Sequence, residues 1–154
     1  MNWKDNVNNP WNITSVYVPA YKILAMHPTG SKFICDPPPL GSDNDTLVLV
    51  DHLGPAREDY TKNGWSETEG ANGYEGEPGY GDLWVSFKKG FLVVENHILV
   101  SDKRLYLDWI GATLMAKEMN LQDKEERVHL HKYMKQLGFV DYYKGPLPGV
   151  KNIE

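Results

Sequence analysis

The stretch GSKFICDPPPLGSDNDTLVLV, residues 30–50, carries the features that decide the fold. It begins with a Gly-Ser pair, passes through three consecutive prolines and ends in the apolar run Leu47–Val50. A continuous apolar run of this kind is typical of a strand that is buried on both faces near the centre of a sheet. We therefore expect residues 46–52 to form a central strand, which follows directly after Asp43 and Asp45.

The acidic residues Asp43 and Asp45 are separated by one residue, so on a strand both side chains point to the same face of the sheet. Two carboxylates held this close repel each other, and a divalent cation between them removes the repulsion. Upstream, a turn at Gly30 and Ser31 offers backbone N–H groups and a hydroxyl that suit phosphate oxygens. The combination predicts a site for phosphoryl or nucleotidyl transfer. The alternative is an ordinary turn cluster, because Gly-Ser-Asp-Asn-Asp is dense in turn-forming residues.

The same residues resemble the signature of the polymerase-beta-like nucleotidyltransferase superfamily, in which a Gly-Ser pair precedes an Asp-x-Asp that runs into a hydrophobic strand. Gly30 and Ser31 are similar to the first part, and Asp43 and Asp45 to the second. Residues 87–127 more faintly resemble small bacteriophage-encoded members. The resemblance implies a nucleotidyltransferase-like core and the metal-dependent transfer of a nucleoside monophosphate from a nucleoside triphosphate to an acceptor. The resemblance does not identify the acceptor, which would be a small molecule, a protein or an RNA end.

The metal site that this resemblance implies has three carboxylates. Asp43 and Asp45 would share two metal ions roughly 4 Å apart. Mg²⁺ is the expected metal, because it prefers hard oxygen ligands. The third carboxylate should come from a neighbouring strand, where Glu95 is the acidic residue. By the fainter similarity, the third position falls on Asn96 or His97 instead. In that case the site lacks one anionic ligand and its activating base, and catalysis would be impaired.

The nucleotide-binding residues implied by the resemblance surround the same turn. Gly30 and Ser31 would hold the triphosphate, and Lys32, Lys88 or Lys89 would balance its charge. Three functions follow as hypotheses. The chain is a nucleotidyltransferase, or a catalytically degenerate relative that binds a nucleotide or a partner protein. As a third possibility, it is an unrelated α+β interaction module, which predicts that the two aspartates lie far from any pocket.

Length and composition fit a single domain with a substantial core, since the chain has 154 residues. The net charge of −5 argues against broad, nonspecific nucleic-acid binding, which needs a basic surface. Cys35 is the single cysteine, so no internal disulfide forms and a reducing compartment fits. We expect a cytoplasmic protein (host cytoplasm, if it is viral). Because no apolar run approaches the length of a transmembrane helix, we expect no membrane partner.

The predicted elements give an α+β fold, with a mixed sheet flanked by helices. The helices are expected at residues 13–27, 53–65, after Ser101, and from Asp123 to Gly138. The strands are expected at residues 32–35, 46–52, 83–88 and 91–100, the last two forming a hairpin. Residues 66–82 are rich in Gly and Glu and are expected to be a flexible loop. Residues 1–12 are expected to be an N-terminal arm, and residues 139–154 an extended tail.

Overall fold

The structure, a computed structural model, describes residues 20–68 and 79–137. Its core is a sheet in the order β1-β2-β5-β4-β3. The central strands β2 and β5 are parallel, and every other neighbouring pair is antiparallel, so the sheet is mixed. The strands are β1 (Ile23–Thr29), β2 (Asn44–Val50), β3 (Ser66–Thr68), β4 (Trp84–Lys89) and β5 (Glu95–Val100).

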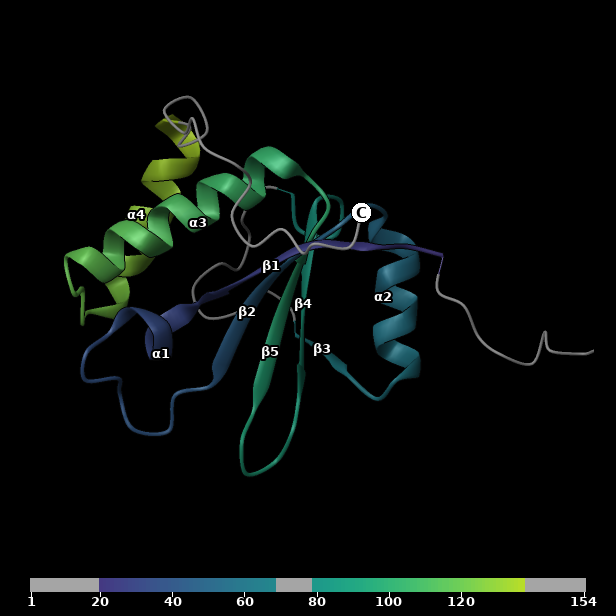
Figure 1. Cartoon of the computed structure of the whole chain (residues 1–154), viewed down its shortest axis with the longest axis horizontal. Helices are drawn as coiled ribbons and strands as arrows, with labels where there is room; N and C mark the ends of the chain where they lie inside the picture. Colours follow the sequence, from purple (N-terminus) through teal and green to yellow (C-terminus); the bar gives the residue numbers. More distant parts are fainter. Residues whose placement is uncertain (1–19, 69–78, 138–154) are drawn as a thin grey trace, which may run out of the picture.

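Helices cover both faces of this sheet (Figure 1). On one face lie α1 (Gly30–Ile34), α3 (Lys103–Glu118) and α4 (Lys124–Leu137). The opposite face is covered by α2 (Leu53–Lys62). The sequence-based prediction of an α+β fold with a mixed sheet flanked by helices is therefore confirmed. None of the helices in the described part of the chain is long and apolar enough to cross a membrane.

Strand β2 lies inside the sheet and is buried on both faces, as the apolar run predicted. Leu47 and Leu49 pack with Trp109 of α3 in one apolar cluster. Val48 and Val50 point the other way and pack against α2. Alternation along the strand therefore places Asp45 on the α3 face, the same face as Leu47.

Two predicted elements near the start of the chain were wrong. Residues 23–29 form strand β1 instead of a helix, while residues 13–19 lie outside the described part. β1 pairs with β2 along its length, and this tertiary pairing decides a segment whose own pattern is ambiguous. Pro28 is tolerated because β1 is an edge strand. Residues 30–34 form helix α1 instead of a strand, and Ile34 packs against Ala116 of α3.

The remaining elements lie near their predicted positions, except that residues 91–94, predicted as part of a strand, form the loop between β4 and β5. The helix after Ser101 is capped by Asp102, whose side chain accepts a hydrogen bond from the Leu105 backbone N–H at 3.0 Å. Of the expected loop, residues 66–68 form β3, and residues 69–78 lie outside the described residues. The expected arm (1–12) and tail (139–154) also lie outside them.

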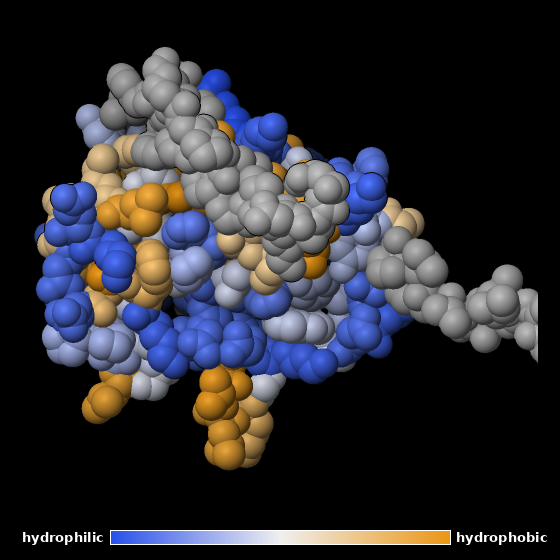
Figure 2. Space-filling view, in the orientation of Figure 1, coloured by the Kyte–Doolittle hydropathy of each residue, from blue (hydrophilic) through white to orange (hydrophobic). Residues whose placement is uncertain are grey.

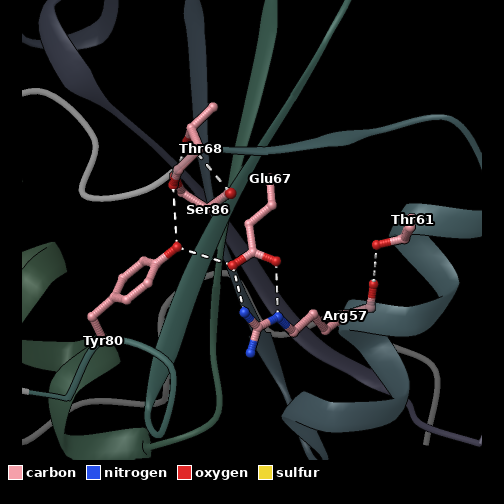
Figure 3. Close-up of polar contacts among 6 residues, drawn as sticks. All are labelled: Arg57, Thr61, Glu67, Thr68, Tyr80 and Ser86. Atoms are coloured by element: carbon pink, nitrogen blue, oxygen red, sulfur yellow. Dashed lines mark hydrogen bonds and ion pairs between the residues drawn. The ribbon is translucent and has the colours of Figure 1, made fainter.

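A polar network holds the short edge strand β3 against α2 and β4 (Figure 3). The Arg57 guanidinium donates two hydrogen bonds to the Glu67 carboxylate, at 2.8 and 2.6 Å. The Tyr80 hydroxyl donates to the same carboxylate at 3.0 Å. Thr68 and Ser86 are hydrogen-bonded through their hydroxyls across β3 and β4. Ser86 also lines the cleft described below, so this network reaches the sheet beneath that cleft.

Candidate functional site

A cleft of about 260 Å³ lies on the α3 face of the sheet, where β1 ends and where β2 and β5 begin. One wall comes from the first turn of α1, at Gly30 and Ser31, and the floor from Asp43, Asp45 and Asn96. The opposite wall is formed by α3 and α4. The structure therefore brings the glycine turn and the aspartate pair together in one concave site. The hypothesis of an unrelated α+β interaction module predicts the opposite, with both aspartates far from any pocket.

The two aspartates converge on Asn96, which occupies the position directly across from Asp45 in the parallel β2–β5 pair. The Asn96 amide donates one hydrogen bond to Asp43 Oδ2 at 3.0 Å and one to Asp45 Oδ1 at 2.7 Å. Both amide protons are thus used, and a neutral donor lies between two carboxylates. The amide partly offsets the repulsion between the two negative charges.

Gly30 allows the turn to approach the second aspartate closely. Its φ of +80° lies in the left-handed region, which glycine adopts without strain. A Cβ atom at this position would lie 1.9 Å from Asp45 Oδ2. Any side chain here would therefore displace the carboxylate, so glycine is required by both the backbone and the packing.

Burial raises the pKa of Asp45 from 3.8 to about 6, and the negative charges of Asp43 and Glu95 act in the same direction. The hydrogen bond from Asn96 opposes this shift and is smaller than the effect of burial. At neutral pH the site therefore holds a carboxylate that is unfavourable in its charged form. Perturbed carboxylates of this kind concentrate at binding and catalytic sites.

Glu95, the residue predicted from sequence as the third carboxylate, lies on the face opposite to Asn96. It is paired in register with Asn44, whose side-chain amide donates to Glu95 Oε2 at 2.8 Å. Its charge nevertheless contributes to the raised pKa of Asp45, so the two carboxylates are close enough to interact. His97 lies on the same face as Glu95 and shares a 2.7 Å hydrogen bond with the Tyr60 hydroxyl.

The lysines predicted to bind nucleotide lie outside the cleft walls. Lys32 is exposed on α1, and Lys88 is exposed on β4, paired in register with Asn96. Lys89 turns toward α2, where its ammonium donates to the Asn63 carbonyl at 2.8 Å. Ser31 does line the cleft, and its hydroxyl contacts that of Ser42 at 3.3 Å.

The cationic side chains that line the cleft, Lys124 and Arg127, come from α4. Lys124 is exposed at the first turn of this helix, and Arg127 is buried one turn later. Arg127 Nη1 donates to the carbonyls of Leu121 and Gln122, each at 2.9 Å. The cleft thus has an acidic floor and a basic wall, which suits a ligand carrying both a cation and phosphate groups.

A buried hydrogen-bonded chain connects the cleft to the interior. The Thr113 hydroxyl donates to the Trp109 carbonyl at 2.9 Å, so the Thr29 hydroxyl is the donor in its 2.6 Å contact with Thr113. His131 joins this chain through Nε2, which lies 3.5 Å from the Thr113 hydroxyl, and its Nδ1 donates to the carbonyl of Arg127 at 2.8 Å. Because Thr29 precedes Gly30, this chain anchors the turn on α3.

The donor set fits one divalent cation. Asp43 and Asp45 supply the carboxylate oxygens that Mg²⁺ prefers, and phosphate oxygens of a ligand would complete the coordination. At the third position, Asn96 presents N–H groups to the aspartates, so it adds no negative charge to the donor set. Within the described residues, no group of three or more His, Cys, Asp and Glu side chains is arranged as a metal site.

Comparisons with known protein families, with curated proteins and with solved structures found no match to this chain.

Proposed function

We propose that this protein binds the complex of a divalent cation with a nucleoside triphosphate in the cleft, on a nucleotidyltransferase-like scaffold with impaired transfer chemistry. Asp43 and Asp45 would hold the cation, for which Mg²⁺ is the expected metal. The turn at Gly30 and Ser31 would contact the phosphates. Lys124, on the opposite wall, would balance their charge.

One observation carries the choice of binding over catalysis, namely the amide of Asn96 beside both aspartates. Efficient nucleotidyl transfer needs a base for the attacking hydroxyl and enough negative charge to hold two cations. A neutral amide supplies neither the base nor the charge. A single cation held by two carboxylates is sufficient to bind the phosphates of a ligand.

The electrostatics of the cleft support the same proposal. Asp45 is unfavourable as an anion in its buried position, and its negative neighbours add to that effect. A cation between Asp43 and Asp45 would relieve both. Ligand binding would therefore be strongly dependent on the metal and would weaken as the pH falls below about 6.

A second candidate is an active nucleotidyltransferase, favoured by the electrostatic proximity of Glu95 to Asp45. In this case the Glu95 side chain would break its hydrogen bond with Asn44 and supply the third carboxylate from the first residue of β5. An acceptor hydroxyl would attack the α-phosphate, pyrophosphate would leave with the electron pair of the broken P–O bond, and the acceptor proton would pass to the carboxylate.

Isothermal titration with each nucleoside triphosphate, with and without Mg²⁺, tests the binding proposal. We expect binding that requires Mg²⁺ in the wild type and is lost in the Asp43→Asn/Asp45→Asn variant. The exposed Asp82→Asn variant, which removes a carboxylate away from the cleft, serves as the matched control. Failure of the wild type to bind any triphosphate in the presence of Mg²⁺ would refute both candidate functions.

Pyrophosphate release with candidate acceptors then separates the two candidates. If the scaffold is impaired by its amide, Asn96→Asp raises the release rate from a negligible level, and Glu95→Gln changes nothing. If Glu95 acts in catalysis, the wild type turns over substantially and Glu95→Gln abolishes this activity. The Asn96→Asp variant should also be less stable without Mg²⁺, because three carboxylates then meet without a cation.

A further inference from the structure

The two loops next to the cleft carry apolar side chains that stand almost fully in solvent. In the loop between β4 and β5, Phe91 is 90% exposed, Leu92 92% and Val93 61%. Leu40, in the loop between α1 and β2, is also fully exposed. Exposed apolar residues are unremarkable when scattered singly, but three in succession at a loop tip mark an interaction surface.

Both loops project from the same side of the molecule and stand apart from each other (Figure 2). The surface of the body behind them is largely hydrophilic in this view. A protein partner would need two separate apolar pockets at a matching spacing to receive them. A flat apolar medium receives both at once, so this arrangement favours a lipid bilayer.

The charges next to the tip point to the kind of lipid. Lys88 and Lys89 precede the apolar tip, separated from it by Gly90, and both are exposed, whereas Glu95, which follows the tip, is half-buried and accepts a hydrogen bond from Asn44. Since the Lys89 ammonium is held by the Asn63 carbonyl, Lys88 is the better placed to meet a headgroup. Lysines next to inserted apolar residues are attracted to anionic lipids. The net charge of −5 prevents strong long-range attraction, so apolar insertion must supply most of the affinity.

We propose that the apolar tip (residues 91–93) and Leu40 insert into the interfacial region of a bilayer containing anionic phospholipids, with Lys88 at the level of the headgroups. Surface binding of this kind needs no helix that spans the membrane. It therefore departs from the sequence-based expectation of no membrane partner, which rested on the absence of a spanning segment. It does not depend on which ligand the cleft binds.

Co-sedimentation of the full chain with vesicles of phosphatidylcholine and phosphatidylglycerol, without nucleotide or Mg²⁺, tests this proposal. We expect the wild type to partition into these vesicles and to partition more weakly into phosphatidylcholine alone. Phe91→Ser and Leu92→Ser should each lower the partition coefficient about tenfold. Leu40→Ser tests the second loop independently and should also lower it. Met119→Ser, a change at an apolar residue that is 59% exposed at the C-cap of α3, is the control and should change nothing.

Circular dichroism verifies that each variant keeps the fold, which is expected because the changed side chains lie in solvent. The proposal is overturned if the wild type ignores the vesicles, if the tip variants bind as well as the wild type, or if phosphatidylglycerol has no effect. It is also overturned if sedimentation velocity shows a dimer that Phe91→Ser dissociates, because the tip then meets a second copy of the chain.

Discussion

Replacing Asp45 with Asn removes a half-buried negative charge while keeping the shape of the side chain and its role as an acceptor for Asn96. Burial raises the pKa of Asp45 from 3.8 to about 6, so the folded state binds its proton more tightly than the unfolded state. This preference stabilises the fold below about pH 4 and is lost as the pH rises through about 6. At about 1.4 kcal/mol per pKa unit, the loss amounts to about 3 kcal/mol.

The replaced side chain in the Asp45→Asn variant does not titrate. The variant should therefore not lose stability by this mechanism as the pH rises through about 6. We expect the variant and the wild type to unfold at similar urea concentrations at pH 4. At pH 8 the variant should be more stable by about 3 kcal/mol, the figure that follows from the raised pKa. The measurement is urea denaturation at both pH values, with Asp82→Asn as the control. The reasoning is contradicted if the variant is no more stable than the wild type at pH 8. It is also contradicted if the difference in stability between them is as large at pH 4 as at pH 8.

Three further changes test other parts of the fold. Gly30→Ala should destabilise the fold by about 1–3 kcal/mol, because the left-handed backbone is strained for alanine and its Cβ would meet Asp45. Gly41→Ala has a similar φ of +75° but an open environment, so a smaller loss of stability in thermal unfolding isolates the steric part. Thr113→Val should cost about 1–3 kcal/mol in urea denaturation, because it leaves buried hydrogen-bonding partners unsatisfied. Glu67→Gln should cost under about 1 kcal/mol, because the ion pair it weakens is solvent-exposed, and added salt should reduce the difference further.

The central strand and the position of the aspartate pair could be predicted from sequence because both depend on local pattern. A continuous apolar run favours a strand buried on both faces, and alternation places Asp43 and Asp45 on one face. β1 could not be predicted in the same way. Its pattern is ambiguous on its own, and its strand form depends on pairing with β2, where Thr29 lies opposite Asp45.

The third position of the site was left open for a physical reason. Alternation along β5 separates Glu95 from Asn96, and sequence alone gives this separation. Which of the two faces Asp45 depends on the register between β2 and β5, and this register is set by packing between segments far apart in the chain. The role of Lys124 could not be predicted for the same reason, because this residue reaches the cleft only through the packing of α4 on α3.

The charged residues of the cleft lower the stability of the fold. An aspartate at position 45 is unfavourable in its charged form at neutral pH, and the Asn96 amide offsets the effect of burial only in part. An uncharged residue of the same shape would make a more stable protein, which is the usual relation between stability and a functional site. A cation that binds the folded state and not the unfolded state would reverse the penalty by mass action. Added Mg²⁺ should accordingly stabilise the wild type at pH 8 and leave Asp45→Asn unchanged, a difference that pure packing of the aspartate pair would not produce.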